Sequence, residues 1–299
     1  MNSLSQYILE KFKISKDIKV QEYNYHPKDR DELKSLVDKL IEERGNEADL
    51  NDIDTSDIID MSSLFRRTNF NGDISSWNVS NVTNMGYMFS ESKFNGDISS
   101  WDVSNVTDMS WMFLSSPFNG NISSWDVSKV KNMCGLFSTS KFDKDISKRA
   151  VSNVEEMEYL FSETPFNQDI SSWDVSNVTN MTNMFERSKF NGDISSWDVS
   201  NVKKMGWMFY MSEFNQDISS WDVSKVKNMS FMFCKSNFNR DISKWDVSNV
   251  TDMSAMFAES KFNQDISKWN VSKVKNMTDI FDDSPLEKNP PKWYKRHKK

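Results

Sequence analysis

The chain has 299 residues and a formal net charge of −7 at pH 7, which is enough length for one or two ordinary domains. An acidic chain of this kind does not favour binding to nucleic acid through the phosphates. Its two cysteines, Cys134 and Cys234, lie at different positions of a repeated sequence, so we expect free thiols rather than a disulfide framework.

The first 49 residues do not follow the repeat that fills the rest of the chain. Leu4, Tyr7, Ile8 and Phe12 have helical spacing, which predicts a short amphipathic helix. This stretch lacks the unbroken apolar run and the small-residue cleavage site of a signal peptide. No later segment reaches the roughly 20 apolar residues of a membrane span. We therefore expect a cytoplasmic or virion-associated location rather than the cell surface.

A second helix is predicted after Pro27, with Gly45 as its stop signal. Its apolar residues recur at helical intervals: Leu33, Leu36, Val37, Leu40 and Ile41. A stack of repeats would expose the apolar edge of its first coil. Residues 1–49 are therefore interpreted as a helical N-terminal cap.

From residue 50 onward the same pattern returns every 24 residues. A partial first coil occupies residues 50–69, and nine full repeats without insertion or deletion fill residues 70–285. Leu286 and Trp293 keep the register in a final segment, residues 286–299, which we interpret as a C-terminal cover with a basic tail. A fixed period of this kind indicates a stack of coils in which each coil contacts only its neighbours.

Within one coil, two spacings suggest local structure. Trp77 and Val79 alternate with period two, as in a very short strand, whereas Met85, Met88 and Phe89 have the spacing of one helical turn. The order Ile-x-x-Trp-x-Val matches the core of a leucine-rich repeat. We therefore predict an α/β solenoid, a right-handed leucine-rich-repeat-like stack with short parallel strands and one helical turn per coil.

The repeat F-N-x-D-I-S-S-W-D-V-S-N-V-T-x-M-x-x-M-F resembles that of the BspA-like leucine-rich-repeat surface proteins, which are also catalogued as a domain of unknown function in mycoplasmas and other bacteria. The resemblance covers about residues 50–285. It implies a surface or adhesion protein and supplies no catalytic residues. The opening Ser5-Gln-Tyr-Ile-Leu-Glu-Lys-Phe-Lys-Ile14, together with residues 29–52, is also similar to the leader of repeat proteins encoded in gut Bacteroidetes and their phages.

Three columns of residues recur, each at the same position, or slot, of most repeats, and each such column could have a function. The tryptophans that follow Ile could form a carbohydrate platform, but a large residue at one slot of every coil is more simply explained by packing. The aspartates that precede Ile, such as Asp73, are expected to cap a turn. Those that follow Trp, such as Asp102, are expected to point outward from a strand and make one face acidic. Calcium along these aspartates is an alternative, although the Gly-rich loops of calcium-binding solenoids are absent.

The position just before the second Met of each repeat, which we call the variable slot, differs most between repeats. It carries an aromatic residue in five of the nine repeats. Exposed aromatic residues mark partner surfaces, while the alternative is that these rings only cover the stack. The predicted partner-binding residues are Tyr87, Trp111, Tyr159, Trp207, Phe231, Tyr210 and Met211.

The fourth repeat breaks the pattern, because Arg149 replaces the tryptophan and Ala150 replaces the aspartate. Losing a core tryptophan would leave a void unless the arginine directs its charge outward. This repeat is either tolerated drift or a polar notch that a partner uses.

Nothing in the sequence indicates an enzyme. Both histidines, His26 and His297, lie outside the repeats, and no phosphate loop, metal-ligand cluster or nucleophile motif occurs. We expect no cofactor and no bound metal. The sequence favours a non-catalytic scaffold that binds a protein or a surface glycan. The alternative is a structural or packaged component of a phage virion, or a self-associating rod.

Overall fold

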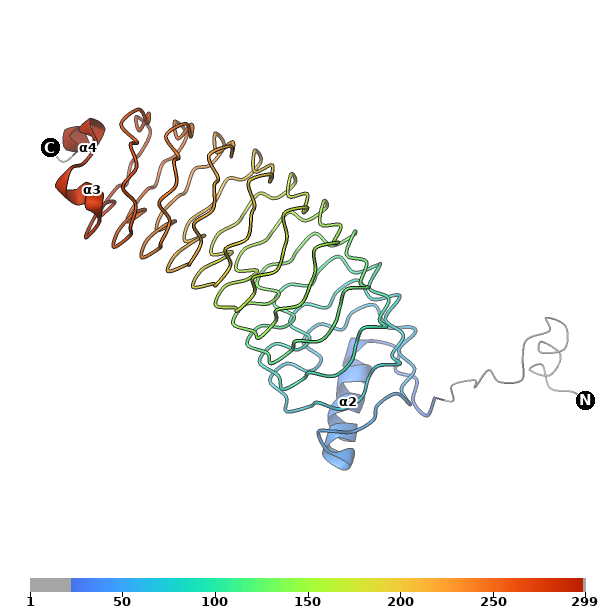
Figure 1. Cartoon of the computed structure of the whole chain (residues 1–299). Helices are drawn as coiled ribbons and strands as arrows, with labels where there is room; N and C mark the ends of the chain where they lie inside the picture. Colours follow the sequence, from blue (N-terminus) through green and yellow to red (C-terminus); the bar gives the residue numbers. More distant parts are fainter. Residues whose placement is uncertain (1–22, 298–299) are drawn as a thin grey trace, which may run out of the picture.

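The computed structural model describes residues 23–297, and the side chains of residues 23–294. The helix expected around Leu4 to Phe12 and the end of the basic tail lie outside the described residues. Within the described residues there are three helices: α2 (Arg30–Arg44), α3 (Pro285–Lys288) and α4 (Lys292–His297). The coils between them stack in a curved row, with α2 at one end and α3 and α4 at the other (Figure 1).

Helix α2 lies where the apolar spacing predicts a helix. Its N-terminus is capped by Asp29, whose carboxylate accepts the backbone N–H groups of Asp31 and Glu32 at 3.0 Å. Gly45 follows the last turn with a φ of 90° and closes it through a bond to the carbonyl of Ile41. Leu33, Val37 and Leu40 are fully buried in the same cluster as the coils. The boundaries predicted at residues 49/50 and 285/286 stay predictions.

The predicted α/β solenoid is wrong, because the coils contain neither strands nor helical turns. Within residues 23–297, pairing between coils is limited to isolated parallel bridges, for example between Asn84 and Asp108. Trp77 and Val79 flank turns instead: the N–H of Trp77 bonds to the carbonyl of Ile74, and Val79 accepts the N–H of Val82. A chain that turns this often leaves no room for a strand.

The expected helical turn at Met85, Met88 and Phe89 is replaced by consecutive tight turns. The N–H of Met88 bonds back to the carbonyl of Met85 at 3.1 Å, three residues earlier. Between them Tyr87 has a φ of 59°, which a right-handed helix does not allow. A helical turn and a pair of tight turns both place residues i, i+3 and i+4 on the same face. The spacing of the buried side chains therefore could not distinguish them, and the helical turn was the wrong prediction.

The backbone N–H groups of this segment find hydrogen-bond acceptors in the next coil and within their own coil. The N–H groups of residues 85, 87, 89 and 91 donate to the carbonyls of residues 108, 110, 112 and 114 in the next coil. The N–H groups of residues 88, 90 and 92 close turns within their own coil. Alternate amides therefore bond along the stack and around the coil, which meets the need of buried backbone groups for partners.

The core is one continuous cluster that runs from Leu33 in α2 to Trp293 in α4. Phe89 stacks on Phe94 at 4.2 Å between ring centroids and on Phe113 of the next coil at 5.6 Å. The tryptophans at the repeated slot are buried, so packing explains that column and not a sugar platform. Each indole N–H bonds to a carbonyl 27 residues earlier, as Trp101 does to Ile74.

Candidate partner-binding surface

The residues at the variable slot share one backbone conformation. In every repeat this residue has a φ between 49° and 61° and so adopts the left-handed conformation. Glycine and asparagine reach that region most easily, whereas a residue with a bulky side chain costs roughly 1–2 kcal/mol there. Gly135 and Asn183 meet this preference. The five aromatic residues at the same slot do not, so local backbone stability does not explain them.

Three of these aromatic residues form what we call the N-terminal row: Tyr87, Trp111 and Tyr159. The rings of Tyr87 and Trp111 are stacked with centroids 6.3 Å apart. Trp111 also reaches Tyr159, two coils away, at 5.6 Å. The coil between them carries Gly135, which provides the space for the indole. The guanidinium of Arg66 lies 4.9 Å from the centre of the Tyr87 ring and ends the row.

The other predicted residues form what we call the C-terminal cluster: Trp207, Tyr210, Met211 and Phe231. Trp207 stacks on Phe231 with centroids 4.1 Å apart and meets Tyr210 edge-on at 4.6 Å. Tyr210 and Phe231 pack on a small hydrophobic cluster that is separate from the main core. Its buried members are Cys234, Ala255 and Ala258. These rings therefore gather on the outside of the stack.

A polar residue separates the two groups. Asn183 occupies the variable slot between Tyr159 and Trp207, is 6% exposed and donates to the carboxylate of Glu186 at 2.6 Å. The structure thus brings the seven predicted residues together as two groups, not as one continuous patch.

The exposure of these side chains lies between the two alternatives, an exposed surface and rings that only cover the stack. Of the seven predicted residues only Met211 is exposed, at 43%; the six aromatic residues are half-buried. Each aromatic ring stacks on or meets a neighbouring ring, so part of its surface is covered. A sugar platform needs free ring faces, and this arrangement does not favour one. Sequence reasoning missed Arg66, the space at Gly135, and Arg187, whose guanidinium lies 5.9 Å from the centre of the Tyr210 ring. All three contacts cross from one coil to the next.

The two groups have different electrostatic surroundings. Burial raises the pKa of the Tyr159 hydroxyl, and the carboxylates of Glu158 and Glu186 raise it further. Beside the C-terminal cluster the exposed cations Lys203, Lys204 and Lys227 precede Trp207 and Phe231 by three or four residues. Among the described residues none of these three lysines forms an ion pair. Three exposed cations without an ion pair among the described residues therefore lie close in sequence to the C-terminal cluster.

Both aspartate columns act as turn caps. Asp73 accepts the N–H of Ser75 at 2.9 Å, as predicted for the first column. Asp102 accepts the N–H of Ser104 at 3.1 Å in the same way, so the second column does not stand on a strand. Hydrogen bonds from these serines lower the pKa of both carboxyl groups, chiefly from the backbone N–H of Ser75 at Asp73 and from the side chain of Ser104, followed by its backbone N–H, at Asp102. Among the described side chains, no group of three or more His, Cys, Asp or Glu is placed to hold a metal ion.

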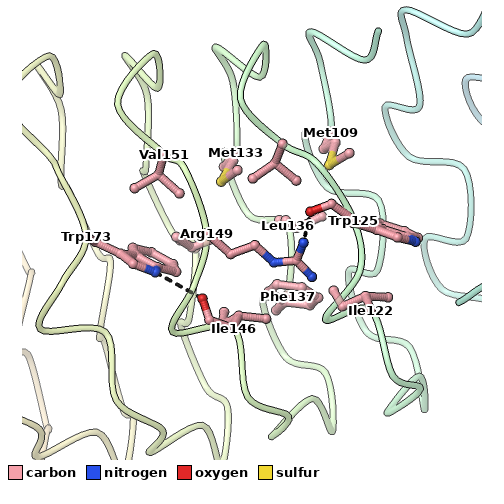
Figure 2. Close-up of a pocket in the computed structure, with 12 residues that line it drawn as sticks. Met109, Ile122, Trp125, Met133, Leu136, Phe137, Ile146, Arg149, Val151 and Trp173 are labelled. Atoms are coloured by element: carbon pink, nitrogen blue, oxygen red, sulfur yellow. Dashed lines mark hydrogen bonds between the residues drawn. The ribbon is translucent and has the colours of Figure 1, made fainter. Parts of the chain in front are cut away.

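The fourth repeat contains a cavity of about 30 Å³ beside Arg149 (Figure 2). The guanidinium extends toward the preceding coil, where Nη1 donates to the carbonyl of Trp125. The void expected from the loss of a tryptophan is therefore present, and the arginine does not carry its charge fully outward.

Comparison with known proteins identifies one family. The model described as "Mycoplasma protein of unknown function, DUF285" matches residues 32–148, 114–216, 136–237 and 211–297, which together span nearly the whole chain. No curated protein and no solved structure matches the chain. None of the helices in the described residues is long and apolar enough to cross a bilayer.

Proposed function

The chain belongs to the family described as mycoplasma protein of unknown function, DUF285, and is a repeat protein. From that premise we propose that it is a non-catalytic scaffold that binds a protein partner through the C-terminal cluster. The likeness of the repeat to BspA-like surface proteins is compatible with an adhesion role for such a scaffold.

The observation that carries this proposal is the left-handed backbone at the variable slot. Trp207 and Phe231 have φ values of 61° and 56°, where asparagine or glycine would cost less. Their rings pack outside the main core with Tyr210, so they contribute little to the stability of the spine. Aromatic residues kept at a strained position on the outside of a fold favour a role in contact with another molecule.

The surroundings favour a protein segment with one apolar anchor and acidic neighbours. Met211 is exposed next to the rings and offers an adaptable apolar contact. Lys203, Lys204 and Lys227 would attract carboxylates and steer such a segment to the cluster. Stacking between Trp207 and Phe231 covers one face of each ring, which leaves less free ring surface for a sugar and makes a glycan the weaker candidate.

A peptide pair tests this proposal. Fluorescent 12-residue peptides with a central leucine flanked by aspartates or by lysines are titrated with the full chain, and anisotropy reports binding. We expect the acidic peptide to bind with a Kd on the order of micromolar and the basic peptide not to bind. The double variant Trp207→Asn/Phe231→Asn should weaken binding at least tenfold. Asparagine is suitable because Asn183 occupies the same slot with the same backbone.

The matched control is Tyr87→Asn/Trp111→Asn, which makes the same change at the N-terminal row. It should leave the affinity for the acidic peptide unchanged. Equal binding of the acidic peptide by all three chains would exclude the C-terminal cluster as its site. Binding of a glycan array by the wild type, lost in the cluster variant, would replace the protein partner with a sugar.

A further inference from the structure

Arg149 stands at the slot that holds tryptophan in the eight other full repeats. Elsewhere the indole fills the space between coils and bonds to a carbonyl 27 residues earlier, as Trp173 does to Ile146 at 3.2 Å (Figure 2). An arginine side chain is narrower than an indole. The space it leaves is a cavity lined by apolar side chains, including Leu136, Phe137 and Ile146.

The charge beside this cavity is only partly balanced by the chain itself. Nη1 of Arg149 donates to the carbonyl of Trp125, whereas Nη2 is buried and has no hydrogen-bond partner. Among the described residues Arg149 forms no ion pair. Burial lowers its pKa to about 10, although Asp145 and Asp126 act in the opposite direction, so the guanidinium remains charged at neutral pH. Arg149 is half-buried, and a charge held partly out of water without an ion pair is costly.

We propose that the cavity beside Arg149 is a binding site for a small monovalent anion, held by Nη2 against the apolar walls. A volume of about 30 Å³ exceeds what one water molecule needs. A water molecule would satisfy the N–H groups of Nη2 but would leave the charge unbalanced. The planar guanidinium fork suits a carboxylate, and the apolar lining accepts a methyl group, so acetate fits as well as a halide. A divalent anion would keep one charge without a partner.

Thermal unfolding of the full chain tests the site. Sodium chloride or sodium acetate replaces sodium gluconate at constant ionic strength, and gluconate serves as an anion too large for the cavity. We expect the wild-type Tm to rise by roughly 2–4 °C and to saturate, because the anion binds the folded chain alone. Arg149→Met keeps an apolar side chain without the charge and should lose the rise. Lys148→Met, which removes the neighbouring exposed cation, should retain it.

Two results would overturn the proposal: an equal rise in wild type and Arg149→Met, or no rise in wild type. Should Arg149→Met fail to fold, crystals of the wild-type chain grown in sodium bromide give an independent reading. An anomalous peak within hydrogen-bond distance of Nη2 is the expected result. Water alone at that position would refute the site.

Discussion

The indole of Trp111 lies across the backbone of Gly135, the residue at the same slot of the next coil. A Cβ atom at Gly135 would overlap the six-membered ring of Trp111. Gly135 also has a φ of 58°. This one position therefore requires glycine for two reasons, the left-handed backbone and the ring that reaches over it toward Tyr159.

Gly135→Ala should destabilise the chain by about 2–4 kcal/mol, because it adds left-handed strain and displaces Trp111. Urea unfolding followed by tryptophan fluorescence measures the change. Ala255→Gly is the matched control, since it makes the reverse change at the same slot, and it should alter stability by no more than about 1 kcal/mol. Similar effects of the two substitutions would contradict the position of the ring.

Arg149→Trp should stabilise the chain by about 2–4 kcal/mol. The indole would fill the cavity, remove a half-buried charge and offer its N–H to the carbonyl of Ile122, 27 residues earlier. Trp197→Arg, the opposite change in a coil with an intact tryptophan, should destabilise by a similar amount. Chemical denaturation of both variants checks the pair, and a loss of stability in both would show that the fourth coil has adapted to its arginine.

The aspartate caps predict a dependence of stability on pH. Backbone N–H bonds from Ser195 and Ser219 lower the pKa of Asp193 and Asp217. A carboxyl group whose folded pKa is depressed stabilises the fold above its unfolded pKa, and this contribution is lost as pH falls through the folded value. Stability should therefore fall below roughly pH 4.

Asp193→Asn/Asp217→Asn isolates these two caps. Asn121 stands at the same slot and caps Ser123 at 2.9 Å, so asparagine preserves the turn without the charge. The variant should be less stable than wild type at pH 7, and the difference should shrink at pH 3. Urea midpoints at both pH values measure this. A constant difference would mean that the charge of the caps makes no contribution.

The period and the buried columns could be predicted from the sequence, and the local backbone could not. Slots spaced by 24 residues identified the Phe, Ile, Trp, Val and Met columns, all of which lie in the core. The same slots left the backbone ambiguous, because Met85, Met88 and Phe89 fall on one face of either a helical turn or two tight turns. Gly135 and Asn183 at the variable slot were the available signal of a left-handed backbone.

The candidate surface was only partly predictable, because its contacts join different coils. The sequence placed Tyr87 and Trp111 in one column but gave no reason for Trp111 to cross Gly135 and reach Tyr159. It also left open whether these rings are exposed or only cover the stack, and ring stacking between coils half-buries them. The two groups are divided at Asn183, whose hydrogen bond to Glu186 a single-residue pattern does not reveal.

The two cysteines are free, as predicted, and both should react slowly. Burial raises the pKa of Cys134 to about 12, with further contributions from Glu158 and Glu156, and raises that of Cys234 to about 11. Only the thiolate is the nucleophile, so alkylation by iodoacetamide at pH 8 should be at least about 100-fold slower than in the urea-unfolded chain.

Glu158→Gln separates the causes of the raised thiol pKa values. The lost carboxylate should speed alkylation of Cys134 severalfold, because one negative charge beside the thiolate is gone. Cys234, whose main acidic neighbour is Glu259, should keep its rate and serves as the control within the same molecule. Mass spectrometry of the two labelled peptides measures both rates in one sample. Faster labelling of both cysteines would indicate general loosening of the stack rather than a local charge effect.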